Sequence, residues 1–123
     1  MTYLSVALGG AAGAMLRYGL SGWLHDLTGM TFPIGTLVVN ILGSFIIGLV
    51  LELSAGRYLF SPEARLLITT GFCGALTTFS TFSFETLALV QEQQWGAAAG
   101  NVVLNLGVCL VATFAGVMLA RAL

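Results

Sequence analysis

A long apolar run without any charge, from residue 34 to residue 51, most restricts what this chain can fold into. A helix needs about 20 mostly apolar residues to cross the hydrocarbon core of a bilayer. Four stretches approach this character, at residues 2–20, 33–53, 64–90 and 95–120. We therefore predict an all-α integral membrane protein with four transmembrane helices.

The composition also requires lipid around the chain. Of the 123 residues, 58% are hydrophobic and 7% are charged, whereas soluble domains carry roughly 25% charged residues. A chain this short buries only a modest fraction of its surface in its own core. With a net charge of −1 and no lysine, it offers no basic patch to nucleic acid. No long linker is present, so we expect residues 1–123 to form one four-helix transmembrane domain.

The positions of the arginines bear on topology. We expect polar loops at residues 25–33, 52–65 and 91–94, so both termini and the second loop lie on one side. That side holds three of the four arginines, Arg57, Arg65 and Arg121. The positive-inside rule favours cytoplasmic termini, but four arginines give a weak bias, and insertion both ways stays open. Arg17 follows the first apolar run, which is the wrong order for a cleaved signal peptide, so we expect a retained helix.

Small residues four apart occur in three of the predicted helices, at Gly9 and Gly13, Ser44 and Gly48, and Gly96 and Gly100. This spacing places them on one helix face and lets backbones approach closely. We expect close packing from these residues rather than chemistry. A bundle of four short helices leaves little room for a pore within one copy, so a transport path would lie between copies.

Polar residues within apolar runs are costly in hydrocarbon and tend to mark pathways. Thr36 and Asn40 share a helix face with Ser44. Asn40 carries two amide donors with no carboxylate beside it, which suits an anion better than a cation. The alternative is a hydrogen bond to a neighbouring helix, and this helix alone does not decide. Asn101 and Asn105, in the last stretch, are interpreted first as interhelical hydrogen-bonding residues.

The third stretch is long for one span, and its middle is rich in glycine, threonine, serine and phenylalanine, which are poor helix formers. We predict a break between Gly74 and Thr78, with a second half-helix from Phe79. Unwound backbone at membrane depth survives only when it is buried in protein or lines a cavity. Its carbonyl groups could hold a small cation.

Two phenylalanines, Phe79 and Phe82, would share a face of this second half-helix, with the hydroxyls of Ser80, Thr81 and Ser83 beside them. The edge of an aromatic ring is positive, so ring edges can face an anion without binding it tightly. Ordinary aromatic packing is the alternative.

Few ionisable or reactive residues remain. Arg17 could snorkel to the interface or draw anions into a vestibule, and Glu85 is expected at a helix end facing water. Cys73 and Cys109 lie in apolar runs, which favours small hydrophobes over a disulfide or a metal pair. The sequence shows no catalytic triad, metal-ligand cluster or phosphate loop, so nothing supports an enzyme.

Three segments resemble the CrcB/Fluc family of fluoride channels. The most specific is GFCGALTTFSTF at residues 71–82, supported by GGAAGAMLRY at 9–18 and GTLVVNILGSF at 35–45. The likeness covers nearly the whole chain. It implies an antiparallel, dual-topology homodimer with a break in the third helix, two pores and a central sodium ion.

The resemblance also implies roles for single residues. The fluoride path would be lined by ring edges, an amide and hydroxyls, from Phe79, Phe82, Asn40, Ser80 and Thr81. Backbone carbonyls from both subunits would bind sodium, at Gly74 and Thr77. Polar positions toward the centre and mouth of the pore match Thr36 and Glu85. Family members often carry tyrosine and serine on the fourth helix where this chain has Asn101 and Asn105, so a pore-lining role is extended to Asn105.

We interpret the chain as a passive channel that exports fluoride across the bacterial inner membrane and protects against its toxicity. Fluoride is small and strongly hydrated, so a pore must replace its water with several donors that do not bind too tightly. The first alternative is a small proton-coupled multidrug exporter, which needs a mid-membrane carboxylate that the first stretch lacks. The second alternative is a structural membrane subunit without transport.

Overall fold

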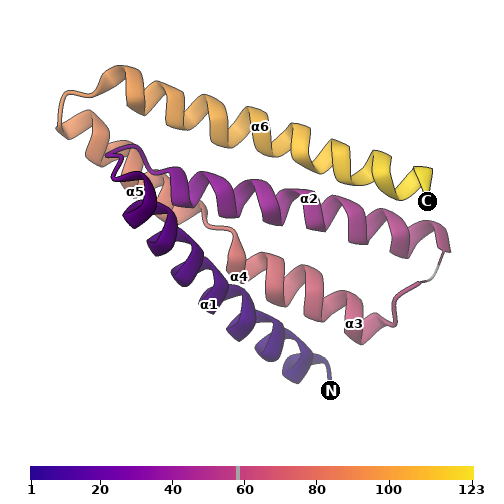
Figure 1. The fold of residues 1–123 in the computed structure, drawn as a ribbon. Helices are drawn as coiled ribbons and strands as arrows, with labels where there is room; N and C mark the ends of the chain where they lie inside the picture. Colours follow the sequence, from indigo (N-terminus) through magenta and orange to yellow (C-terminus); the bar gives the residue numbers. More distant parts are fainter. Residues whose placement is uncertain (58) are drawn as a thin grey trace.

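The computed structural model describes residues 1–57 and 59–123, and every element in these ranges is helical. The elements are α1 (Thr2–Thr28), α2 (Ile34–Arg57), α3 (Pro62–Leu66), the π-helical η1 (Leu67–Cys73), α4 (Gly74–Leu76), α5 (Phe79–Gln91) and α6 (Trp95–Ala122). Figure 1 shows α6 lying along α2, while α1 crosses the bundle and packs on η1. The prediction of an all-α chain is confirmed.

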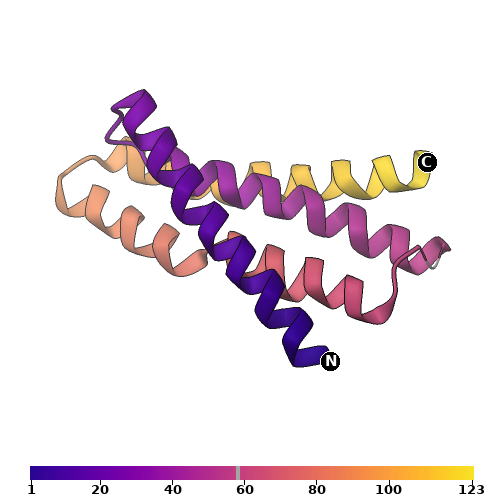
Figure 2. The same cartoon turned by 60° about the horizontal axis from the view of Figure 1, so that its bottom comes forward.

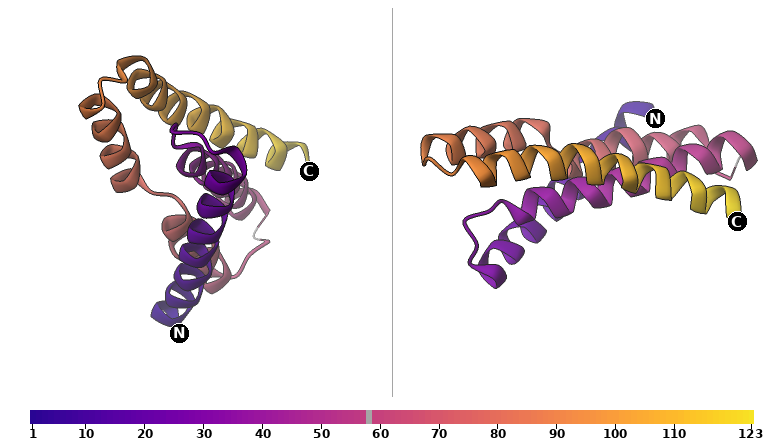
Figure 3. Two further views of the ribbon diagram at one scale, coloured as in Figure 1. Left: turned by 60° about the vertical axis from the view of Figure 1, so that its left-hand side comes forward. Right: turned by 90° about the horizontal axis from the view of Figure 1, so that it is seen from above.

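Three stretches are long and apolar enough to cross a membrane, namely Ile34–Gly56, Pro62–Gln91 and Trp95–Ala122. They agree with the second, third and fourth predicted spans and indicate a membrane protein. α1 has 27 residues, which is sufficient length, but its many small residues and Arg17 make it less apolar. A span by α1 therefore stays a prediction. Both termini lie toward the same end of the bundle (Figures 1 and 3), as an even number of crossings requires.

The first helix is longer than expected, because the predicted polar loop from residue 25 is wrong over its first four positions. His25, Asp26 and Thr28 all lie in α1. The helix ends at Gly29, which has φ 60° and donates its N–H to the His25 carbonyl at 2.9 Å. A left-handed glycine is a common helix terminator. The helix ends because of the conformation of Gly29, and not because of the polar side chains that precede it.

The second predicted loop is also shorter than expected. Glu52 lies inside α2, and Arg65 lies inside α3, so neither belongs to a loop. The Ser61 hydroxyl caps α3 by accepting the Ala64 N–H at 3.1 Å, a favoured arrangement at helix starts. Glu52 accepts a hydrogen bond from Arg121 Nε at 2.7 Å, which joins the ends of α2 and α6.

Glycines bring helix backbones together at two of the three predicted places. A Cβ on Gly9 or Gly13 would collide with backbone carbonyl oxygens of η1, and one on Gly48 would collide with the backbone of α6. Close packing is thus confirmed for the pair in α1 and for Gly48 in α2. Gly96 and Gly100 make no such approach within the single chain, because no described atom lies within 4 Å of a Cβ placed there.

The third segment is interrupted within the predicted interval. α4 ends at Leu76, and the next two residues are extended, with φ −80° and ψ 154° at Thr77 and φ −150° and ψ 118° at Thr78. α5 then begins at Phe79, as predicted. Figure 2 shows α1 crossing over the third segment where its two halves connect, and α5 contacts α2.

Candidate functional site

Two side chains hold the break open. Thr78 donates its N–H to Asn40 Oδ1 at 2.7 Å, and Thr81 donates its N–H to Thr78 Oγ1 at 3.2 Å. In a continuous helix these two N–H groups would bond carbonyls four residues earlier, those of Gly74 and Thr77. The side chains of Asn40 and Thr78 therefore take the place of these carbonyls and release both from helical pairing.

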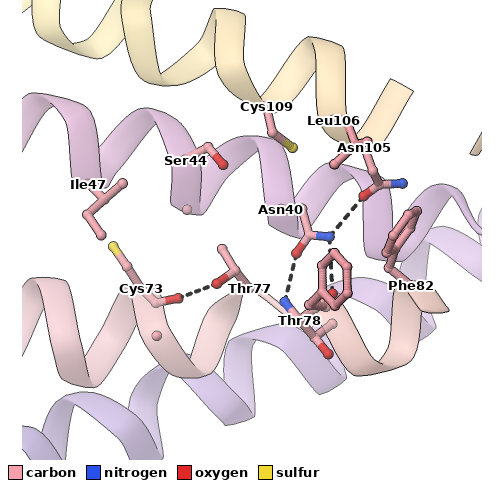
Figure 4. Close-up of a pocket in the computed structure, with 13 residues that line it drawn as sticks. Asn40, Ser44, Ile47, Cys73, Thr77, Thr78, Phe82, Asn105, Leu106 and Cys109 are labelled. Atoms are coloured by element: carbon pink, nitrogen blue, oxygen red, sulfur yellow. Dashed lines mark hydrogen bonds between the residues drawn. The ribbon is translucent and has the colours of Figure 1, made fainter. Parts of the chain in front are cut away.

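Two cavities border this break. The first, of about 300 Å³, is shown in Figure 4 and is lined by Asn40, Gly43, Ser44, Ile47, Cys73, Gly74, Thr77, Thr78, Phe79, Phe82, Asn105, Leu106 and Cys109. The second, of about 800 Å³, includes Arg17, Thr36, Thr78, Thr81 and Glu85 in its wall. Thr78 lines both cavities and thus lies between them.

The two phenylalanines lie side by side at the start of α5. Their ring centroids are 5.2 Å apart with an angle of 56° between the planes, a tilted arrangement that brings an edge toward a face. Phe79 is 72% exposed in the single chain, whereas Phe82 is 6% exposed. Both line the first cavity, so the structure brings together the rings that the sequence singled out.

Glu85 does not lie at a helix end facing water, and that prediction is wrong. It sits within α5, half-buried against α2, and accepts a hydrogen bond from Thr36 Oγ1 at 2.7 Å. Its other oxygen, Oε2, is buried without a hydrogen-bond partner among the described residues. Thr36 and Glu85 thus form one polar group in the wall of the second cavity, which Arg17 also lines.

Hydroxyl groups cluster around Thr78, a residue that the sequence analysis did not single out for the site. Thr78 Oγ1 donates to Thr81 Oγ1 at 3.0 Å and lies 3.3 Å from Ser80 Oγ. Ser80 lines neither cavity, while Ser83 donates back to the Phe79 carbonyl at 2.8 Å. Threonine is favoured at helix N-caps, so its position directly before the predicted half-helix was the signal for Thr78.

The asparagines of α2 and α6 do contact one another. Asn40 Nδ2 donates to Asn105 Oδ1 at 2.9 Å, and Asn105 Nδ2 donates to Asn101 Oδ1 at 2.9 Å. The interhelical alternative for Asn40 is therefore observed, although the same side chain also lines the first cavity.

The two cysteines form no disulfide with each other. Cys73 is buried and Cys109 is half-buried, and both thiols are free. No cluster of three histidine, cysteine, aspartate or glutamate side chains suited to a metal occurs in the part of the chain that the structure describes.

Known proteins resemble this chain along nearly its full length. The family described as "CrcB-like protein, Camphor Resistance (CrcB)" matches residues 4–117. A protein named fluoride-specific ion channel FluC from Geotalea uraniireducens is 48% identical over 122 residues, covering 99% of this chain and 98% of that protein. The protein of the same name from Sorangium cellulosum is 45% identical over 118 residues, covering 96% and 93%. This chain therefore belongs to the CrcB-like protein family.

Proposed function

We propose that this protein is a fluoride-selective channel that lets fluoride leave the cytoplasm passively and so protects the cell. The observation that carries the proposal is the chemistry of the first cavity, where none of the described lining residues is charged. Its wall instead contains asparagine amides, hydroxyl groups and two phenylalanine rings. Fluoride needs several compact donors in place of its water, and a fixed positive charge would hold it too tightly to leave.

The route that we propose runs from the second cavity through the hydroxyls at Thr78 to the first. Arg17 lines the second cavity together with Asp26 and Glu85, and its positive charge would offset the repulsion between these carboxylates and an entering anion. Thr81 and Thr78 would then replace water around the ion before it reaches Phe79 and Phe82. The names of the relatives support fluoride as the ion that takes this route.

We further propose that two copies assemble antiparallel, giving two pores in the bacterial inner membrane. The exposed ring of Phe79 and the exposed Gly74 border the first cavity in the single chain. A second copy would cover both. The assembly therefore completes a site that one chain leaves partly open.

We also propose a sodium ion at the break as a structural cofactor. Gly74 and Thr77 present carbonyls released from helical pairing, and both line the first cavity. Neutral carbonyl oxygens of unwound membrane helices are suitable ligands for sodium. With two carbonyls from each subunit, the ion would join the two chains and add a positive charge between them.

Fluoride efflux from liposomes tests the function. We expect purified protein to release fluoride far faster than chloride, as followed with ion-selective electrodes against protein-free liposomes. Equal rates for the two halides would contradict selectivity, and no fluoride release would contradict the channel. Glu85 is a half-buried acid in α5 that a proton-coupled exporter could use. Transport of organic cations driven by a pH gradient would favour that alternative.

A further inference from the structure

The backbone of the break fixes the orientation of the Asn40 amide. The Thr78 N–H can only donate, so the atom 2.7 Å from it must be the oxygen Oδ1. Nδ2 then faces Asn105 Oδ1 at 2.9 Å and the Thr78 carbonyl at 3.3 Å (Figure 4). The bond to Asn105 is the shorter one. One amide hydrogen is thus held firmly, and the other rests in a long contact that an ion could replace.

Asn105 presents only its oxygen to Asn40. Its Nδ2 donates to the backbone carbonyl of Asn101 at 3.0 Å and to Asn101 Oδ1 at 2.9 Å. These two acceptors occupy both N–H bonds, and the side chain is 6% exposed. Because an oxygen acceptor repels an anion, Asn105 is better placed to hold Asn40 than to bind fluoride.

The chain of hydrogen bonds continues past Asn105 and returns to α5. Asn101, which is fully buried, donates from Nδ2 to Thr86 Oγ1 at 2.9 Å. Thr86 in turn donates to the Phe82 carbonyl at 2.8 Å. A continuous series of hydrogen bonds therefore links Thr78, at the break, through side chains of α2 and α6 to Phe82 in α5. Thr78 precedes the first turn of α5 and Phe82 lies at the end of that turn, so the hydrogen bonds span the turn that carries both rings.

Along this series of hydrogen bonds, the orientation of each side-chain amide is set by the group that donates to its oxygen. The Thr78 N–H fixes Asn40, Asn40 fixes Asn105, and Asn105 fixes Asn101, because each oxygen that accepts leaves the nitrogen facing onward. Buried networks in which every donor is satisfied are rigid and specify one arrangement. A change at the far end would leave a buried donor without a partner and disturb the arrangement as a whole.

We propose that Asn101 and Asn105 are positioning residues of this pore, which fix the donor of Asn40 and the first turn of α5 without touching the ion. The inference rests on the proposed function, because fluoride is the ion that Asn40 would meet. Asn105 then acts on the ion through Asn40, in place of the direct pore-lining role that the family resemblance suggested for it. The proposal also adds Asn101 and Thr86, which line neither cavity, to the residues on which transport depends.

Thr86→Val is the mildest test, because it keeps the shape of the side chain and removes only the hydroxyl at the end of the network. We expect fluoride efflux to fall roughly fivefold, the effect of one net hydrogen bond. We also expect the side-chain amide resonances of Asn40 to shift in NMR spectra of the full-length protein. Ser54→Ala is the matched control, since its hydroxyl also donates to a carbonyl four residues earlier, at 2.6 Å, outside the network. It should change neither readout.

Asn101→Ala gives a second, independent comparison. Asn101 and Thr86 act in series, so the double variant Asn101→Ala with Thr86→Val should conduct fluoride no more slowly than Asn101→Ala alone. Multiplied effects, or unmoved Asn40 resonances in Thr86→Val, would overturn the proposal. If Asn101→Ala fails to fold, Thr86→Val decides by itself. A wild-type protein that moves no fluoride would refute the function, while the NMR comparison would still test the network.

Discussion

Replacing either phenylalanine by isoleucine separates solvation of the ion from ordinary packing. Phe79 is 72% exposed and Phe82 is 6% exposed in the single chain. Loss of the tilted pair costs about 0.5–1.5 kcal/mol in either variant, and Phe82→Ile also loses buried contacts, for a total of about 1–3 kcal/mol. If the rings only pack, Phe79→Ile should therefore lower both stability and fluoride transport less than Phe82→Ile does.

If the ring edges solvate fluoride, both variants should lose transport to a similar extent. A barrier raised by about 1.4 kcal/mol lowers the rate tenfold, so we expect at least a tenfold loss even for Phe79→Ile. Fluoride efflux from liposomes measures the rate, and thermal unfolding with gel filtration measures stability and assembly. Wild-type efflux from a well-folded Phe79→Ile protein would show that the rings only pack, and the assignment of these residues to the path would fall.

Three further predictions follow from the packing and the ends of the helices. Gly13→Ala should destabilise the protein by about 1–3 kcal/mol, because its Cβ would meet the backbone of η1; Gly19→Ala, which has open space around it, is the control in thermal unfolding and should not destabilise. Arg121→Ala should cost less than about 1 kcal/mol, because its ion pair with Glu52 is exposed, and high salt should abolish the difference from wild type. A cysteine introduced by Glu92→Cys, in the exposed α5–α6 loop, should be labelled from both sides of the membrane in separate populations; labelling from one side alone would exclude the antiparallel assembly.

The break in the third segment could be predicted because it has a local cause. Poor helix formers surround Gly74, and the helix is indeed lost before Phe79. Its narrow extent, only Thr77 and Thr78, could not be predicted. It depends on Asn40, which is 38 residues away in sequence and becomes a neighbour only when α2 packs beside the third segment.

The burial of Glu85 was missed for the same reason. Its partner Thr36 is 49 residues away, and a lone acid near the end of an apolar run gives no sign of such a bond. The end of α1 was misjudged for a different reason. Polar side chains from His25 onward suggested a loop, but a helix tolerates them, and Gly29 supplies the terminating conformation.

Asn40 has two functions in this arrangement, and one substitution can separate them. Asn40→Asp keeps an oxygen that can accept the Thr78 N–H, so the break should persist. The second carboxylate oxygen would replace Nδ2, which faces Asn105 Oδ1 and the first cavity.

A negative charge at that position repels both the Asn105 oxygen and an entering anion. We therefore expect Asn40→Asp to assemble but to conduct at least tenfold less fluoride than wild type. Asn40→Leu removes the acceptor as well, and should lower the unfolding temperature by more than Asn40→Asp does, because a buried backbone donor loses its partner at a cost of about 1–3 kcal/mol. Efflux and thermal unfolding of the two variants give the comparison. Normal efflux from Asn40→Asp would show that the ion does not pass this amide, and Asn40 would then serve only to hold the break open.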